Sequence, residues 1–553
     1  ERKEIQSSGV FPDSVDVIIS TYSMFNRAPT NKKGELVSIS GSWIREAFDE
    51  RVIIVADECH NSIGPGNTGK NITIAKSRVP DWQFLAATAT PYKTPREAIF
   101  YDHLIPKVAG NAVALLSALP AGREAAQEGL TTQLTEDGSW MRRTRGLSGL
   151  TINSVFPDDA EMEFNQKAMN EFSMIAELMV TASAKSRHRS SRIIEARINE
   201  MVREGQSRDV AIKRVKEITN DSDQFGNAVT QLTRMIIVAL RCRSIEGGAL
   251  RDLDEGRKPI ISFDQTMMSM FSEMLARGDD VSGLTMRDQI LRVLERIYKF
   301  QIADEQFDMR DLDPDIATGY QEIRELVAQF PDLPASPIDD LIDKIKAAGY
   351  SVGELSGRSF TYSNGEVRQR SKEERDKIAT TDKFNSGEYD VLVHNKTGAT
   401  GVNFQAHEDF LDQRQRSTWI ADVFEEVIKM LQGFGRSDRY KQTSSPIINW
   451  QMTGLLGEMR LFQQVNRRLR VLGASVDANR NHPMLIESVP DFLNKIGDQA
   501  FTEVLRRFPQ YATRMGMEYV LPRPQQEGQE QNDEDANITF EGNNVAARAM
   551  SRL

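Results

Sequence analysis

The sequence predicts an α/β protein built on parallel sheets, with large helical insertions and a helical C-terminal region. Three β-rich runs, at residues 15–22, 51–58 and 82–90, are apolar along most of their length and end in polar residues. Near-continuous apolar strands are typical of parallel sheets that helices cover on both faces. Two long stretches between the β-rich parts instead carry apolar residues at helical spacing. Together these patterns favour sheet domains interrupted by helices.

The first sheet domain is expected at residues 1–115. Its three β-rich runs carry their polar residues at the C-terminal end, which is where ligands bind in open α/β sheets. Residues 116–255 follow as a mainly helical insertion, because residues 160–184 and 191–218 carry apolar side chains three and four positions apart.

A second sheet domain is expected at residues 256–455, with a helical insertion at about 270–335. Its β-rich runs are residues 257–266, 389–404 and 444–452, and residues 336–358 predict a helix, a glycine turn and a strand. A helical C-terminal region at 456–521 and a disordered acidic tail at 522–553 complete the predicted order. The tail is polar and poor in apolar residues.

Composition excludes some classes of protein. Two cysteines among 553 residues make a disulfide framework improbable and a zinc site of four cysteines impossible. No apolar run approaches the roughly 20 residues of a membrane span. The net charge of -11 argues against bulk attraction to nucleic acid, although a local groove stays open. We expect a reduced protein without membrane contact, in the cytoplasm of a bacterium or of a phage-infected host.

Asp57 and Glu58 end the second β-rich run, in the sequence D-E-C-H. In ATP hydrolysis one carboxylate can hold Mg²⁺ through water while its neighbour orients the attacking water. An acidic turn at a strand end would give the same pair. The interpretation therefore depends on further signals downstream.

Three further stretches fit chemistry on a nucleotide. Residues 87–90 read A-T-A-T, residues 397–403 form a glycine-rich turn, and residues 432–439 read Q-x-x-G-R-x-x-R. Backbone N–H groups of such a turn can meet phosphate, and two arginines at this spacing can lie on one helix face and clamp a phosphoryl group. Each stretch alone is also a common turn or a solvated helix end.

In order, these four stretches resemble motifs II, III, V and VI of superfamily 2 helicases. The resemblance implies two RecA-like domains with ATP in the cleft between them. Residues 336–358, 431–446 and 454–474 are further similar to the strawberry notch group of helicase-like proteins, which occurs in animals, bacteria and phages. The bacterial or phage type fits better, because the long extra regions associated with animal members are absent.

The resemblance implies ATP and Mg²⁺ as cofactors and a role for each matching residue. Asp57 would hold Mg²⁺ through water, Glu58 would be the general base, and Gln432 would sense the γ-phosphate or attacking water. The implied arginine fingers are Arg436 and Arg439, the residues lining the cleft are Thr397, Gly398, Gly401 and Gly435, and those coupling nucleotide state to nucleic-acid grip are Thr88 and Thr90. We expect His60 to hydrogen-bond between motifs and Cys59 to pack.

Residues 64–71 almost spell a second signature, the phosphate-binding G-x-x-x-x-G-K-[ST]. The stretch ends in Asn71 instead of a hydroxyl residue, and Pro65 removes one donor N–H. It also follows the acidic box, whereas helicases place the phosphate loop before it. We therefore expect Lys70 not to bind phosphate. The true loop is expected upstream of Glu1 or outside this chain, whose first residue is not methionine.

Two basic stretches could contact nucleic acid. Lys185, Arg187 and Arg189 lie in a probable helix, and Trp140 precedes Arg142 and Arg143 in a mixture suited to base stacking. A solvated helix face and a buried tryptophan are the plain alternatives. Residues 465–473 more simply predict a packing helix with extended arginines. Without a base-reading motif, binding to DNA or RNA would be sequence-tolerant.

Two functions remain open at this stage. The first is an ATP-dependent helicase or translocase that couples Mg-ATP hydrolysis to movement on DNA or RNA. The second is a catalytically weak, helicase-like scaffold that binds nucleic acid and transcription or genome-handling proteins through the helical insertion and acidic tail. A nuclease-fused motor is disfavoured, because no P-D…(D/E)-x-K pattern lies on convincing strands.

Overall fold

The computed structural model describes residues 16–17, 19–26, 52–63, 66–80, 83–88, 100–101, 123–141, 150–216, 225–264, 271–272, 274–275, 278, 280–302, 305–363, 365–395, 401–423, 427–476, 485–486, 488–489 and 494–517. The chain divides into two units. Unit 1 comprises residues 1–148 and 464–487, and unit 2 comprises residues 149–463 and 488–553.

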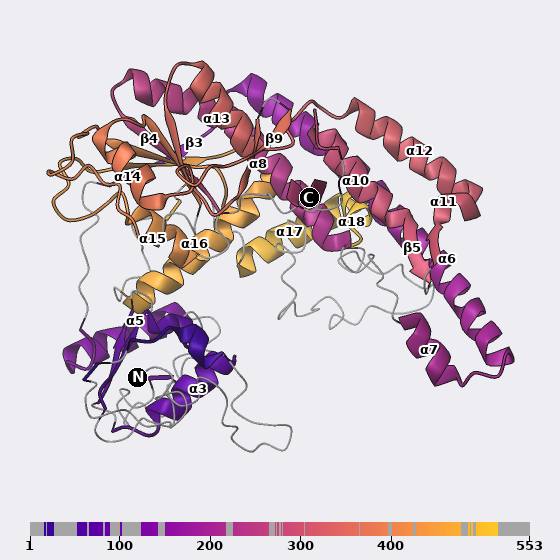
Figure 1. The fold of residues 1–553 in the computed structure, drawn as a ribbon, viewed down its shortest axis with the longest axis horizontal. Helices are drawn as coiled ribbons and strands as arrows, with labels where there is room; N and C mark the ends of the chain where they lie inside the picture. Colours follow the sequence, from indigo (N-terminus) through magenta and orange to yellow (C-terminus); the bar gives the residue numbers. More distant parts are fainter. Residues whose placement is uncertain are drawn as a thin grey trace. The chain divides into compact units, whose positions relative to one another are not determined.

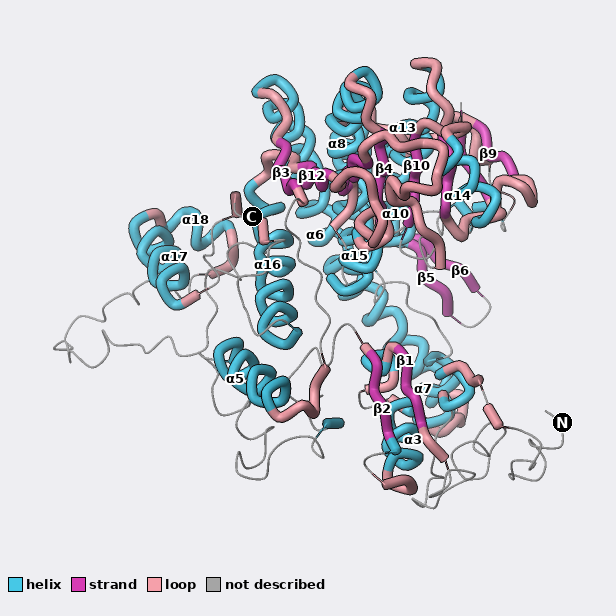
Figure 2. Tube along the Cα trace, turned by 90° about the vertical axis from the view of Figure 1, so that its left-hand side faces the viewer, coloured by secondary structure: helices cyan, strands magenta, loops and turns pink. Residues whose placement is uncertain are grey.

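Unit 1 contains two parallel strands, β1 (Ile54–Asp57) and β2 (Phe84–Ala87), which lie side by side in Figure 2. Alternate side chains of these strands pack into one small core with Phe25, Ile72 and Tyr101. The helical elements described here are η1 (Tyr22–Phe25), η2 (Cys59–Asn61), α3 (Asn67–Lys76) and α5 (Arg123–Glu136).

Unit 2 is built on a six-stranded, wholly parallel sheet of order β3-β12-β11-β4-β10-β7. Figure 1 labels β3 and β4 of this sheet. Parallel neighbours need crossover connections, and helices supply them here. The strands are β3 (Thr151–Val155), β4 (Lys258–Phe263), β7 (Val352–Leu355), β10 (Val391–Asn395), β11 (Arg416–Ile420) and β12 (Ile447–Gln451). The predicted α/β class with parallel sheets is thereby confirmed.

Helices cover both faces of this sheet. Ile261 on β4 packs with α8 (Phe225–Asp254) and α13 (Pro337–Ala347), whereas its neighbour Ile260 packs with α14 (Lys377–Ser386) on the other face. Trp450 on β12 meets Phe434 of α15 (Val427–Phe434) and Phe462 of α16 (Leu456–Val476). Because successive side chains point to opposite faces, the apolar runs of the sequence fill two cores at once.

A second, helical core lies within unit 2. Phe172 of α6 (Asp159–Arg203) packs there with residues of α8, α10 (Met286–Tyr298) and α12 (Pro314–Gln329). Asp158 caps α6 by accepting a 2.8 Å hydrogen bond from the Glu161 N–H, which fits the preference of Asp for this position. The remaining elements are α7 (Arg208–Lys216), β5 (Lys299–Ile302), β6 (Glu305–Asp308), α11 (Met309–Leu312), β8 (Phe360–Ser363), β9 (Glu366–Gln369), α17 (Lys495–Arg507) and α18 (Pro509–Arg514).

Several expectations about elements need correction. Residues 16–17 and 19–21 are not a strand, and Val17 and Ile19 are exposed. Residues 151–155, expected within a helical insertion, are β3 of the sheet, and β11 was not predicted. The expected boundaries also shift, because unit 2 begins at residue 149 instead of 256. The polar residues of β3 and β11 explain why the local sequence pattern did not predict these two strands. The strands that pair with them are distant in the sequence. The predicted tail at 522–553 lies outside the described residues.

Candidate active site

The acidic box sits where β1 ends. Asp57 is the last residue of the strand and is exposed, and the backbone N–H of Glu58 donates a 3.0 Å hydrogen bond to Asp57 Oδ1. Tyr22 Oη donates to the Asp57 carbonyl at 2.6 Å. Glu58 has a left-handed backbone with φ of 48°. Such a conformation is costly for a residue other than glycine and tends to gather at functional sites.

His60 joins the acidic box to the next strand. Its Nδ1 lies 2.9 Å from Thr88 Oγ1 and 3.3 Å from Glu58 Oε2, and the His60 side chain is only 6% exposed. β1 and β2 are parallel neighbours, so the residues that follow them meet at one edge of the sheet. The hydrogen bond expected between motifs is present. Thr90 lies outside the described residues.

Cys59 and Trp140 belong to the core of unit 1. Cys59 is fully buried, and its Sγ lies 3.0 Å from Tyr101 Oη. Burial raises the pKa of the Cys59 thiol. The Trp140 ring packs edge-on against Tyr101 with 5.7 Å between ring centroids. Packing therefore describes both residues, and base stacking by Trp140 is not supported. Arg142 and Arg143 lie outside the described residues.

The stretch at 64–71 starts a helix that follows the acidic box. Lys70 is exposed in the first turn of α3, and the Asn71 side chain is buried and donates a 2.7 Å hydrogen bond to the Phe25 carbonyl. Asn71 thus stands where a phosphate loop has its Mg²⁺-binding hydroxyl, and it serves packing. Gly64 and Pro65 lie outside the described residues.

In unit 2, the glycine-rich stretch follows β10. All five residues of β10 are buried, and burial lowers the pKa of His394 to about 4. Residues 396–400, which include Thr397 and Gly398, lie outside the described part of the chain. Gly401 follows as an exposed residue with φ of 84°, a conformation that suits glycine.

The two candidate arginines lie on a turn and not on a helix face. α15 ends at Phe434, so Gln432 is in its last turn while Arg436 and Arg439 follow it. Gly433 and Gly435 favour this early end, because glycine is a poor helix former. Arg439 Nε donates to the Gly435 carbonyl at 3.1 Å. The prediction of one helix face is therefore wrong, although the residues stay within one short segment.

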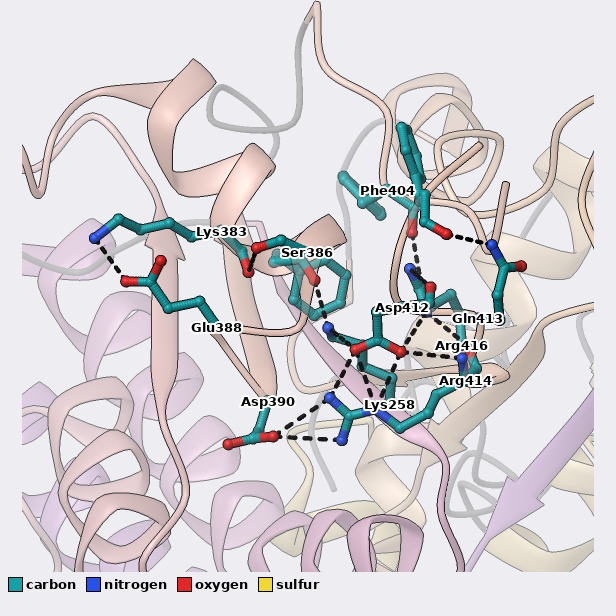
Figure 3. Close-up of polar contacts among 12 residues, drawn as sticks. Lys258, Lys383, Ser386, Glu388, Asp390, Phe404, Asp412, Gln413, Arg414 and Arg416 are labelled. Carbon is teal, nitrogen blue, oxygen red and sulfur yellow. Dashed lines mark hydrogen bonds and ion pairs between the residues drawn. The ribbon is translucent and has the colours of Figure 1, made fainter. Parts of the chain in front are cut away.

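A buried network of ion pairs and hydrogen bonds contacts the turn that carries Arg436 and Arg439. The Phe404 N–H donates to the Arg436 carbonyl at 3.1 Å, and the Phe404 carbonyl accepts from Arg416 Nε at 3.0 Å. Arg416 opens β11 and is 1% exposed. Figure 3 shows Arg416 beside Asp412, Arg414 and the other residues of the network. The turn with the arginines therefore lies at the edge where β11 and β12 begin.

Lys258 is the buried centre of this network. Its Nζ pairs with the Asp412 carboxylate and the Phe384 carbonyl, and it lies 4.2 Å from the centroid of the Phe384 ring. Burial lowers the pKa of Lys258 to about 8. Burial alone would raise the pKa of Asp412, but hydrogen bonds from Arg414 and Lys258 hold it well below its usual range. Arg414 reaches on to Asp390 at 3.3 Å (Figure 3).

Sequence reasoning missed two other buried ion pairs. Arg241 on α8 binds Glu458 on α16 through Nε at 2.9 Å and Nη2 at 2.5 Å. Arg358 binds Asp339 and Glu354 at 2.7 and 2.6 Å. Glu458, Asp339, Glu354 and Arg358 all lie in stretches that carry the family resemblance. That resemblance was the only signal for Glu458, whose partner Arg241 is 217 positions away, whereas Glu354 and Arg358 stand at the spacing of an i,i+4 pair.

The basic residues of α6 lie on two flanks of the helix. Lys185, Arg187 and Arg189 are all exposed, and Arg189 forms a 3.3 Å ion pair with Asp313. Lys185 and Arg189 are four positions apart and share a face, which the exposed Arg192 extends. Arg187 lies on the other flank. The three predicted residues are thus not one patch.

Two general findings apply to the described residues only. No group of three or more His, Cys, Asp or Glu side chains there could hold a metal ion. The same part of the chain contains no helix of the length and apolarity that crossing a membrane requires.

Comparison with known proteins finds similarity to strawberry notch homologues. Residues 336–539 match the model of the C-terminal domain on strawberry notch homologues. Mouse strawberry notch homolog 2 is 24% identical over 594 residues, which cover 93% of this chain and 43% of the mouse protein. Chicken strawberry notch homolog 1 is 26% identical over 32% of this chain and 15% of its own length. The chain thus spans less than half the length of these relatives.

A plant relative and one solved structure were also found. Protein FORGETTER 1 of Arabidopsis thaliana is 29% identical over 27% of this chain and 12% of its own length. The match to the helicase domain of Pyrococcus furiosus Hef covers 73% of this chain and 71% of that chain, at 13% identity and a TM-score of 0.26. The chain is therefore similar to strawberry notch homologues, and its residues 336–539 match the C-terminal domain of those proteins.

Proposed function

We propose that this chain belongs to an ATP-dependent helicase or translocase of superfamily 2, which couples hydrolysis of Mg-ATP to movement on DNA or RNA. The single observation that carries the proposal is the contact of His60 with both Glu58 and Thr88. It joins the candidate base to the next strand, so a change at the nucleotide can move the residues after β2. An acidic turn without chemistry has no need of this link.

The residues around the acidic box fit hydrolysis of a phosphate ester. The exposed Asp57 carboxylate at the end of a parallel strand suits a hydrated Mg²⁺ ion. When bound, that ion supplies charge neutralisation on the phosphate oxygens. Glu58 would orient the attacking water and accept its proton. The left-handed backbone at Glu58 and its contact with His60 set the direction of that carboxylate.

Unit 2 would supply the remaining groups. Arg436 and Arg439 would stabilise the charge on the transferring phosphoryl group, and Gln432 would sense the γ-phosphate. Gly401 and Gly435, together with Thr397 and Gly398, would line the nucleotide cleft. The Phe404–Arg436 backbone hydrogen bond ties the segment after Gly401 to the arginine turn, which supports a shared role.

Glu58→Gln tests this proposal in the natural full-length protein. Loss of a general base slows the chemical step by about 10²–10⁴-fold, so kcat for ATP should fall by that factor while KM changes little. Glu136 is an exposed carboxylate on α5, so Glu136→Gln is the matched control and should keep wild-type turnover. Wild-type turnover in Glu58→Gln would exclude this chemistry. No turnover in the wild type would favour the scaffold function.

The protein is proposed to move along DNA or RNA and to bind it without sequence preference. One flank of α6 carries Lys185, Arg189 and Arg192, and Arg187 lies on the other flank. Lys185→Glu and Arg192→Glu should each weaken binding to single-stranded DNA or RNA and reduce the salt dependence of affinity, because each removes one phosphate contact. Arg187→Glu carries the same charge change on the other flank and serves as the control. Equal effects of all three, measured by fluorescence anisotropy across a salt series, would contradict a one-sided contact.

A further inference from the structure

Two described residues other than glycine have a positive φ, and each lies within or directly after a candidate nucleotide motif. The first is Glu58 in the acidic box, and the second is Lys441, with φ of 64°, two positions after Arg439. Between Arg439 and Lys441 stands Tyr440, whose side chain is 81% exposed. A strained backbone persists only where the surroundings impose it, and such positions cluster at ligand-binding sites.

The surroundings of Lys441 do impose this conformation. The Lys441 carbonyl accepts a 3.0 Å hydrogen bond from the Glu408 N–H, and its Nζ pairs with Glu408 Oε1 at 2.5 Å. The Thr443 N–H donates to the Ala406 carbonyl at 2.8 Å. The turn is therefore held from both sides of Lys441. It presents the Tyr440 ring outward on a fixed backbone.

Packing does not account for Tyr440, because a ring that is 81% exposed contributes little to a core. Its neighbours point instead to a ligand. Tyr440 directly follows Arg439, and the turn from Gly435 to Tyr440 carries both candidate arginine fingers. Residues 436–440 thus carry two arginines and one exposed aromatic ring, and such a set suits phosphate contacts together with stacking on a base, which are the two ends of one nucleotide.

We infer that Tyr440 is the platform on which the base of the hydrolysed nucleotide stacks. The inference rests on the proposed function and deepens it, because it makes the preferred substrate a nucleoside triphosphate and not the bare triphosphate. Stacking tolerates any base, since every base has a π-face. The site would therefore discriminate weakly between ATP and GTP at this position. Arg436 and Arg439 contact the phosphates, and Tyr440 contacts the base.

Three variants of the natural full-length protein test this role. Removal of a stacking ring costs roughly 1–3 kcal/mol per base, or about 5- to 150-fold in affinity. Tyr440→Ala should weaken ADP binding in calorimetry by that factor, while inhibition by inorganic tripolyphosphate stays unchanged. Tyr440→Phe keeps the ring and should keep most of the affinity. Tyr511→Ala removes a 49% exposed tyrosine on α18 and should bind ADP as the wild type does.

The other outcomes overturn the inference in distinguishable ways. Unchanged ADP affinity in Tyr440→Ala, with weaker binding to single-stranded DNA or RNA, would show that Tyr440 contacts the nucleic acid and not the hydrolysed nucleotide. An equal loss of ADP and tripolyphosphate binding would mean that Tyr440 only shapes the turn. If the wild type binds ADP through Tyr440 but hydrolyses no ATP, the inference holds and the proposed function fails. A wild type that binds no ADP overturns the inference directly.

Discussion

Replacing Glu458 with glutamine is expected to lower the free energy of unfolding by roughly 3–5 kcal/mol. The Glu458 carboxylate is 1% exposed and binds Arg241, which is also 1% exposed, through Nε at 2.9 Å and Nη2 at 2.5 Å. Its second oxygen accepts the Thr453 N–H and Thr453 Oγ1, each at 2.8 Å. Glutamine keeps the shape of the side chain but leaves the buried guanidinium charge without its counter-charge. Urea unfolding of both proteins measures the difference.

The chain offers a matched control for this variant. Arg197 and Glu200 form a pair of similar length, 2.6 Å, with side chains that are 48% and 54% exposed. Exposed pairs contribute at most about 1 kcal/mol, so Glu200→Gln should change stability little. Equal effects of Glu458→Gln and Glu200→Gln would contradict the role of burial. The result matters for function because Glu458 fixes the end of β12 and the start of α16 against α8.

The second large effect is expected from Gly248→Ala. A Cβ atom at Gly248 would lie 2.3 Å from Cη2 of Trp419, which is 4% exposed and donates from Nε1 to Asp252 at 2.7 Å. The indole must move, or α8 must lift from the sheet. Overpacking of this kind costs roughly 1–3 kcal/mol or more. We expect a lower midpoint of thermal unfolding and a change in tryptophan fluorescence.

Gly247→Ala separates packing from helix propensity. At Gly247 the nearest atom to an added Cβ is Arg251 Nη1 at 3.7 Å, an ordinary contact. Alanine is the better helix former by about 0.5–1 kcal/mol, so this variant should be as stable as the wild type or slightly more stable. A Gly248→Ala protein that gains stability as Gly247→Ala does would show that α8 and Trp419 are not in close contact.

The sequence predicted the apolar strands better than the strands that mix polar and apolar residues. β4 and β10 carry the apolar runs that a covered parallel sheet requires, and their approximate positions were predicted. β11 opens with Arg416, Ser417 and Thr418, and no local pattern shows that Arg416 is buried among backbone carbonyls. β3 reads Thr-Ile-Asn-Ser-Val and mixes polar with apolar residues at the edge of the sheet. Both depend on partners that only the fold supplies.

The candidate site likewise combines features that the sequence predicted with features that it did not predict. The resemblance of D-E-C-H to the helicase acidic box implied that His60 would hydrogen-bond between motifs, and His60 Nδ1 lies 2.9 Å from Thr88 Oγ1. The expectation that Arg436 and Arg439 share a helix face was wrong. The eight-residue helix α15 ends at Phe434, between Gly433 and Gly435. No sequence rule predicted the positive φ at Lys441, because that conformation depends on Glu408, 33 positions earlier.

The proposed function depends most on the requirement that ATP hydrolysis needs both Glu58 and Arg436. The most direct measurement is a double-mutant cycle on ATP turnover by the natural full-length protein with Glu58→Gln, Arg436→Ala and both together. Loss of an arginine finger slows hydrolysis by about 10³–10⁵-fold. Residues that act as a unit are not additive, so the double variant should turn over no more slowly than the slower single variant. Wild-type turnover in either single variant, or a double variant slowed by the product of the two single effects, would contradict joint action of Glu58 and Arg436 in hydrolysis.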